Sequence, residues 1–320
     1  MKGTIMFRKT LSAAAIAAAI GMPGMVFAQA APAPADAKPA EPKPSYTLTG
    51  NFGFFSQYIF RGLTQTAHQP AVQGGFDWAH ESGFYLGTWA SNISWLRENQ
   101  VGVGVPAGVT NGLYGTGGSM EWDFYGGYKW NLPKDFVIDV GTLYYWYPGK
   151  LNGSVINASL PNNVPSADTW EVYVAPSWKW ITFKASYSVL DHIFGVDQAK
   201  GSYYLDLSAN VPLGDVMSKS LDGFTLNLHW GYQKYKGTDP RNVALPGGVA
   251  PQSNDSLDSY KDVKAGLTYA LPKDFTIGAF YSKAYNYNQQ AYGSAFNAPV
   301  GPFPYDQGKG TGTVFIQKTF

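Results

Sequence analysis

Four histidines, His68, His80, His192 and His229, are the side chains of this sequence best suited to proton transfer or metal binding. They are scattered through 320 residues and lack the HExxH spacing that sets two metal ligands on one face of a helix. Cysteine is absent, so neither a thiolate metal site nor a disulfide framework is expected. The sequence therefore predicts no metal site, no cofactor and no catalytic residue.

Charged residues recur at every second position along several segments, which places them on one face of an extended strand. In residues 121–130, Glu121, Asp123 and Lys129 share one face, and Trp122 and Phe124 lie on the other. A face with this many charges is too polar for a dry core, so we expect it to line a pore. The predicted pore-lining residues are Asp77, Glu121, Asp123, Asp139, Glu171, Asp206 and Asp262, the bases Arg61, Lys129, Lys184 and Lys264, and His229.

Acids outnumber bases among these predicted pore-lining residues by seven to four. Such an excess favours cations weakly, because a narrow polar lumen focuses the field of its charges. The alternative is a set of ion pairs that only fill a narrow barrel. Arg61 illustrates both readings: its planar guanidinium could line a constriction or bind an anion, or it could pair structurally with Asp77 or Glu121, which we favour. Tyr145 and Tyr147 are further candidates for the lining, although we favour girdle or packing roles for them.

The segments that carry these residues repeat with the strand period of two, and we find no convincing amphipathic helix after Tyr46. Most segments have 10 to 12 residues, the length of a tilted membrane-spanning strand. The twelve predicted strands are 46–60, 70–80, 84–93, 119–130, 136–147, 168–177, 180–189, 202–212, 224–233, 259–269, 275–284 and 311–320.

Short and long connections alternate between these segments, with five short turns and six longer loops. This alternation is typical of an outer-membrane barrel whose two termini lie in the periplasm. The pentapeptide LPKDF occurs at 132–136 and again at 271–275, and both copies are interpreted as turns. The loops 94–118 and 234–258 are the candidates for folding inward and narrowing the lumen.

The N-terminus indicates export. Residues 1–28 combine three basic residues, a short apolar run and a small-residue cleavage site, as in a cleaved signal peptide. Residues 29–45 are rich in Ala and Pro and predict a disordered linker. The barrel is predicted over 46–320, and the mature protein is expected in the cell outer membrane of a Gram-negative bacterium.

Composition agrees with a membrane barrel: 16% of residues are aromatic and only 14% are charged, too few charges to coat a large water-exposed surface. The formal net charge of +1 argues against nucleic acid as a partner. A soluble β-sandwich or lipocalin-like barrel shares the period of two. Aromatic residues crowd the strand ends as in interfacial girdles, however, and this favours contact with outer-membrane lipid.

Lipid-facing catalysis needs a serine, a histidine and an orienting polar group on the outer wall. Only His80 has outward parity, beside the turn that holds Ser82. That arrangement is ordinary for a turn, so no enzyme activity is expected. The last strand ends in Phe320 and resembles the signal read by the barrel-insertion machinery, the remaining expected partner.

The first third of the predicted barrel carries a specific pattern: SQYIFRGLTQT at 56–66, PAVQGGFD at 70–77, SGFY at 82–85 and GTWASN at 87–92. It continues through Glu121, Asp123, Tyr125, Gly127 and Tyr128. This run resembles the TorF family of proteobacterial porins, although Gln57 stands where that family commonly has Asp. The resemblance implies an outer-membrane pore-like protein and names no substrate.

The expected fold is therefore all-β, an antiparallel transmembrane β-barrel of about twelve strands. The expected function is a porin-like channel for passive diffusion of small hydrophilic solutes or ions, weakly cation-preferring. The alternative is a non-conducting barrel that acts through its surface loops, in adhesion or membrane integrity.

Overall fold

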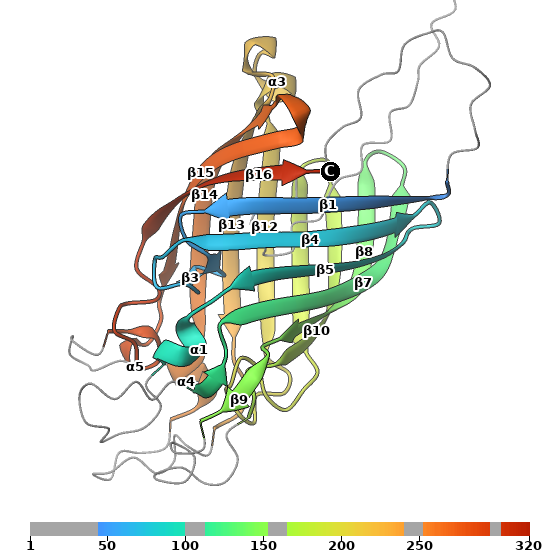
Figure 1. Ribbon diagram of the computed structural model, residues 1–320. Helices are drawn as coiled ribbons and strands as arrows, with labels where there is room; N and C mark the ends of the chain where they lie inside the picture. The colour runs from blue at the N-terminus through green and yellow to red at the C-terminus, as the bar shows by residue number, and fades with distance from the viewer. Residues whose placement is uncertain (1–43, 100–112, 153–164, 240–251, 295–301) are drawn as a thin grey trace, which may run out of the picture.

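The computed structural model describes residues 44–99, 113–152, 165–239, 252–294 and 302–320, and these form a closed antiparallel β-barrel (Figure 1). Each wall strand pairs with the next along the chain, and the first pairs with the last, Asn51 opposite Thr319. Closure leaves no strand edge unpaired, as hydrocarbon requires. The twelve wall strands are β1 (Tyr46–Phe55), β4 (Ala71–His80), β5 (Phe84–Asn92), β7 (Met120–Leu132), β8 (Phe136–Trp146), β10 (Thr169–Trp178), β11 (Ile181–Ser188), β12 (Tyr203–Pro212), β13 (Phe224–Lys234), β14 (Tyr260–Leu271), β15 (Phe275–Tyr285) and β16 (Thr311–Thr319).

The predicted fold class and all twelve strands are confirmed, with one instructive difference in the first strand. It leaves the wall at Phe55, whereas the sequence pattern continues to Phe60. Residues 56–70 instead fold into the barrel, where β2 (Ile59–Phe60) and β3 (Leu63–Thr64) form a small hairpin. Residues 57–66 are all buried against the barrel interior.

Short elements gather at the two ends of the barrel (Figure 1). One end holds α1 (Trp95–Glu98), β6 (Tyr114–Gly117), β9 (Gly149–Leu151), α4 (Asn254–Asp258) and α5 (Gln289–Tyr292), and we call it the loop end. The other, the turn end, holds α3 (Leu213–Val216), η1 (Lys219–Leu221) and η3 (Pro272–Asp274). Among the described helices, none has the length and apolarity needed to span a membrane.

The two LPKDF copies are turns, as predicted, and they share one backbone conformation. Lys134 and Asp135 have φ of 61° and 64°, and Lys273 and Asp274 have φ of 63° and 60°. Four non-glycine residues in the left-handed region indicate that the repeat is a specific solution for closing neighbouring strands.

The outer wall is apolar between two aromatic girdles. Large apolar side chains point outward from the wall strands, such as Leu86 with 62% of its surface exposed and Val140 with 42%. Trp122 and Trp146 contact each other towards the loop end, with ring centroids 5.8 Å apart, and Phe136 and Trp178 stack at the turn end. An exposed apolar surface of this extent marks contact with something other than water, here the hydrocarbon of a bilayer.

Both described chain ends lie at the turn end, because β1 begins and antiparallel β16 finishes there. The backbone of Phe320 exchanges two hydrogen bonds with Gly50, at 2.7 and 2.9 Å, and its ring covers that glycine. The predicted signal peptide, 1–28, and nearly all of the linker, 29–45, lie outside the described residues, as do parts of the loops 94–118 and 234–258 that we expected to fold inward.

Candidate functional site

The inward hairpin of residues 56–70 crosses the barrel interior. Its tip is a two-residue turn, Arg61-Gly62, with φ of 45° and 79°, the signs that match the twist of a tight hairpin. Gly62 approaches the opposite wall so closely that a Cβ atom would lie 2.5 Å from the Cβ of Asp262. Only glycine fits this position, because it has both a positive φ and no room for a side chain.

Arg61 fastens the tip to the wall. Its guanidinium donates to both oxygens of Glu171 on β10, at 3.0 and 2.8 Å, and to Gln233 Oε1 on β13, at 2.7 Å. It also lies over the ring of Tyr204 on β12, 4.1 Å from the centroid. The side chains of the ion pair are 3% and 1% exposed. The sequence correctly suggested a structural pairing for Arg61 but named Asp77 or Glu121; the hairpin carries Arg61 across the lumen to Glu171 instead.

Glu121 and Asp123 lie beside the hairpin on β7 and differ in how they are satisfied. The two oxygens of Glu121 accept from the hydroxyls of Tyr58 in the inward segment, at 2.6 Å, and Tyr147, at 2.8 Å. Neither oxygen of the fully buried Asp123 has a hydrogen-bond partner among the described residues. Glu121 is thus a second anchor for the hairpin, and Asp123 is an uncommitted carboxyl group next to it.

A histidine joins two carboxylates on the opposite wall. His229 Nδ1 lies 3.1 Å from Asp206, and its Nε2 lies 2.8 Å from Asp262. Tyr204 donates to the other oxygen of Asp262 at 2.8 Å. This cluster links β12, β13 and β14 directly opposite the hairpin tip.

The remaining predicted pore-lining residues also lie on the inner face. Asp77 accepts from Tyr125, and Asp139 accepts from Tyr85, each at 2.7 Å, while Lys129 lies 3.9 Å from Asp139. The two other lysines rest on aromatic rings: Lys184 is 3.9 Å from the centre of Tyr173, and Lys264 is 5.5 Å from that of Phe280. The structure thus brings all twelve predicted residues to the interior; their role in permeation stays a prediction.

Sequence reasoning named Tyr145 and Tyr147 for the interior but passed over the other tyrosines there. A phenol hydroxyl donates to each of Asp77, Glu121, Asp139 and Asp262, which satisfies carboxylates that would otherwise be costly to bury. The signal was available, because Tyr85, Tyr125, Tyr173 and Tyr204 share the parity of the acids.

Glycines on neighbouring strands make room for these rings. Gly141 pairs directly with Tyr173, and a Cβ there would lie 2.5 Å from the phenol oxygen; Gly127 faces Tyr85 in the same way. At Gly312 on β16, by contrast, a Cβ would meet nothing within 4 Å. Some of the glycines in this barrel are therefore required because a larger residue would displace the interior tyrosine rings.

The interior is filled at the level of the hairpin. Glu121, Asp123, Glu171, Asp206 and Asp262 are each at most 2% exposed. The ion pairs and tyrosine hydrogen bonds described above therefore occupy the cross-section, as the ion-pair alternative anticipated. In this conformation the hairpin is the constriction of the lumen.

His68 lies where the hairpin returns to the wall, outside the spanning strands. Its Nδ1 is 2.8 Å from Gln57 Oε1, and its ring packs against Tyr305. Partial burial lowers the pKa of His68, and the positive charge of Lys309 lowers it further, against a smaller opposing effect of Asp306. The base of the hairpin is therefore built around a neutral imidazole.

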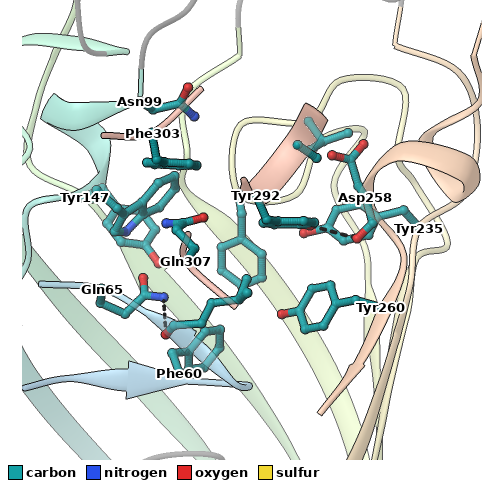
Figure 2. A pocket seen from close by; sticks show the side chains of 15 residues that line it. Phe60, Gln65, Asn99, Tyr147, Tyr235, Asp258, Tyr260, Tyr292, Phe303 and Gln307 are labelled. Atoms are coloured by element: carbon teal, nitrogen blue, oxygen red, sulfur yellow. Dashed lines mark hydrogen bonds between the residues drawn. The ribbon is translucent and has the colours of Figure 1, made fainter. Parts of the chain in front are cut away.

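A pocket with about 600 Å³ of empty space, part of it open to solvent, lies above the hairpin at the loop end. Figure 2 shows the rings of Phe60, Tyr147, Tyr260 and Tyr292 around it, with the amides of Gln65 and Gln307 among them. Phe60 belongs to the hairpin, and Arg61 lies next to its ring, 4.8 Å from the centroid. The constriction thus forms the floor of this pocket.

The outward pair of His80 and Ser82 was the one arrangement that could suggest hydrolysis. Ser82 Oγ lies 2.7 Å from His80 Nδ1, but the same nitrogen also accepts the backbone N–H of Ser82 at 3.2 Å. Among the described residues no carboxylate hydrogen-bonds this ring, and no group of three acids or histidines could hold a metal ion. The contact is that of a local turn.

A closed antiparallel barrel with an apolar outer wall and a charged interior is a transmembrane β-barrel. The chain belongs to the Gcw_chp family, described as bacterial protein of unknown function, whose model matches residues 39–320. No curated protein is significantly similar to it in sequence.

Solved structures similar to this chain include two porins and OprD. The KdgM porin is 9% identical with a TM-score of 0.43, over 85% of this chain and 99% of that one. The NanC porin is 11% identical with a TM-score of 0.42, over 85% and 98% of the two chains. OprD of Pseudomonas aeruginosa is 12% identical with a TM-score of 0.35, over 87% and 67%.

Proposed function

We propose that this protein is an outer-membrane channel for the passive diffusion of small hydrophilic solutes or ions, constricted by the hairpin of residues 56–70. The observation that supports the proposal is the charged lining of the barrel interior. Charged side chains line the inner face of the closed wall from Asp77 towards the turn end to Glu121 and Glu171 at the hairpin. Filling a membrane barrel with apolar residues would be less costly than burying so many charges, so their presence favours a path for polar solutes.

The proposed orientation places the turn end and both termini in the periplasm and the loop end outside the cell, as in bacterial barrels of this class. The exported precursor would lose residues 1–28, and the barrel-insertion machinery would read the strand that ends in Phe320. The TorF-like residues in the first third of the barrel support the same assignment. No nucleic-acid partner, cofactor or catalysis is proposed.

We further propose a weak preference for cations. Seven acids and four bases lie on the inner face or at the hairpin tip, but contacts reduce the free excess. Arg61 is committed to Glu171, and His229 lies between Asp206 and Asp262. Asp123 lies beside the hairpin and has no hydrogen-bond partner among the described residues.

Liposome swelling tests permeation without assuming a charge preference. The refolded protein is expected to admit small neutral solutes slowly, and a variant with residues 58–66 replaced by a short Gly/Ser linker is expected to admit them faster. The matched control shortens the exposed turn that holds α3 and η1, which does not touch the interior. Equal and negligible swelling in all three folded proteins would contradict the proposal.

A non-conducting barrel is the second candidate, and the filled cross-section at the hairpin is the observation that favours it. In that case the loop end would carry the function, in adhesion or membrane integrity. Failure of the linker variant to admit solutes would decide for this candidate.

A further inference from the structure

The pocket at the loop end is built mainly from aromatic side chains of separate elements. Phe60 comes from the hairpin, Tyr147 follows β8, Tyr260 begins β14 and Tyr292 lies in α5 (Figure 2). The rings of Tyr260 and Tyr292 meet edge to face, 5.2 Å apart and inclined by 71°, so they form two walls at a steep angle. Ring faces presented in several directions suit a ligand with flat apolar surfaces of its own.

Polar groups are spaced among these rings. The amides of Gln65, Asn99 and Gln307 line the pocket. Trp95, a lining residue that is 8% exposed, has an indole N–H with no hydrogen-bond partner among the described residues. A buried N–H donor without a partner is costly, and a ligand oxygen would satisfy it.

The charge of the lining argues against an acidic ligand. Among the described lining residues Asp258 alone is ionisable near neutral pH, and it is acidic. Arg61 lies beneath the floor of the pocket and is committed to Glu171. A carboxylate or phosphate entering this pocket would lose its hydration without gaining a cation.

A trimethylammonium or other organic cation would match the rings and Asp258. It would leave the Trp95 N–H and the amide groups without acceptors, however. An aromatic ligand would use the rings but few of the amides. A compound with apolar ring faces and hydroxyl groups around its edge uses both kinds of lining.

We infer that this pocket binds an uncharged sugar, as a mono- or disaccharide, through stacking on its rings and hydrogen bonds to its amides and to the Trp95 N–H. The inference rests on the proposed function insofar as the pocket is the outer vestibule of a channel; binding itself requires no conduction.

Calorimetric titration of the refolded full barrel tests this directly. The detergent is a polyoxyethylene ether, because maltoside and amine-oxide detergents would themselves present a sugar or a cationic group. The ligands are glucose, galactose, maltose, galacturonate, choline and 4-hydroxybenzoate. At least one neutral sugar is expected to bind with a Kd of about 1–10 mM, more tightly than the three charged compounds.

Trp95→Phe keeps an aromatic ring and removes the N–H, so we expect sugar binding to weaken about twofold to tenfold. Trp130→Phe is the matched control, because Trp130 faces outward near the turn end, and we expect no change. Heat-modifiable electrophoretic mobility shows that both variants fold.

Three results would overturn the inference: no saturable binding of any neutral sugar, tighter binding of galacturonate, choline or 4-hydroxybenzoate, or equal weakening in both variants. Conduction is measured separately. A barrel that conducts but binds no sugar would refute the sugar site and leave the proposed channel function intact. A barrel that binds sugar but conducts no current would refute the channel function and leave the sugar site intact.

Discussion

The Arg61–Glu171 contact makes a quantitative prediction about the hairpin. Arg61→Ala removes four hydrogen bonds, at 3.0 and 2.8 Å to Glu171, 2.7 Å to Gln233 and 3.4 Å to Tyr145, and leaves Glu171 buried without its counter-charge. With side-chain exposures of 3% and 1%, solvent provides almost no screening. Breaking such a buried pair costs about 3–5 kcal/mol. The ratio of docked to released hairpin should therefore fall by about a hundredfold to a few thousandfold.

Single-channel recording in planar bilayers measures this change. The wild type is expected to dwell in low-conductance levels, and Arg61→Ala is expected to show longer and larger openings. Glu171→Gln should act in the same direction, because it leaves the guanidinium without its counter-charge. The double variant Arg61→Ala/Glu171→Gln should cost less than the sum of the two single changes, since neither unpaired charge remains.

Lys129→Ala is the control variant for these recordings, because it removes an interior positive charge that does not hold the hairpin. Lys129 lies 3.9 Å from Asp139 and its side chain is 28% exposed, so this pair is worth at most about 1 kcal/mol. Its removal should alter ion selectivity slightly and leave the dwell times unchanged. Identical dwell times in Arg61→Ala and the wild type, with both barrels folded, would refute the claim that Arg61 holds the hairpin in its docked position.

Three further predictions concern the wall and the base of the hairpin. In urea titrations of vesicle-inserted protein, Val140→Arg, near the middle of the outer wall, should lower the free energy of unfolding by about 2–4 kcal/mol. Leu132→Arg, at a strand end and similarly exposed, should lower it by at most about 1 kcal/mol. Equal losses in the two variants would contradict the placement of the membrane. Gly141→Ala should cost about 1–3 kcal/mol in the same assay, because its Cβ displaces a tyrosine ring, whereas Gly312→Ala should be neutral, and the reverse order would refute the packing argument. The lowered pKa of His68 means that the unfolded chain binds its proton more readily, so hairpin docking is fully supported above pH 6.5 and weakens as pH falls through the lowered value. The hydrogen-exchange protection factors of residues 56–70, corrected for the intrinsic rate at each pH, should fall towards pH 5 in the wild type but not in His68→Gln. An equal fall in both proteins would contradict this prediction.

The number of strands and the direction of their side chains could be predicted from the sequence, because lipid-facing and inward-facing residues alternate strictly along each strand of a membrane barrel. In residues 121–130 every second side chain must face hydrocarbon, so Trp122 and Phe124 identify the outer face without any structure. The turns at LPKDF were readable for a similar reason, since Lys-Asp in the left-handed region closes both strand pairs in the same way.

The first strand and the partners of its charged residues could not be predicted in this way. Residues 56–60 continue the alternation of β1, and only the crossing of the lumen, made possible by Gly62, distinguishes an inward hairpin from a longer strand. Arg61 and Glu171 are 110 residues apart, and no local pattern pairs them. The tyrosine hydroxyls escaped notice because phenols on the inner parity look like packing residues until their carboxylate partners are placed.

The central claim is that solutes cross the membrane through this interior. Single-channel current from the refolded wild-type barrel across a planar bilayer, recorded in asymmetric KCl, tests it most directly. The account predicts discrete small steps and a reversal potential of the sign given by a modest preference for K⁺. A correctly folded barrel that stays silent, both as wild type and with residues 58–66 replaced by a linker, would contradict it.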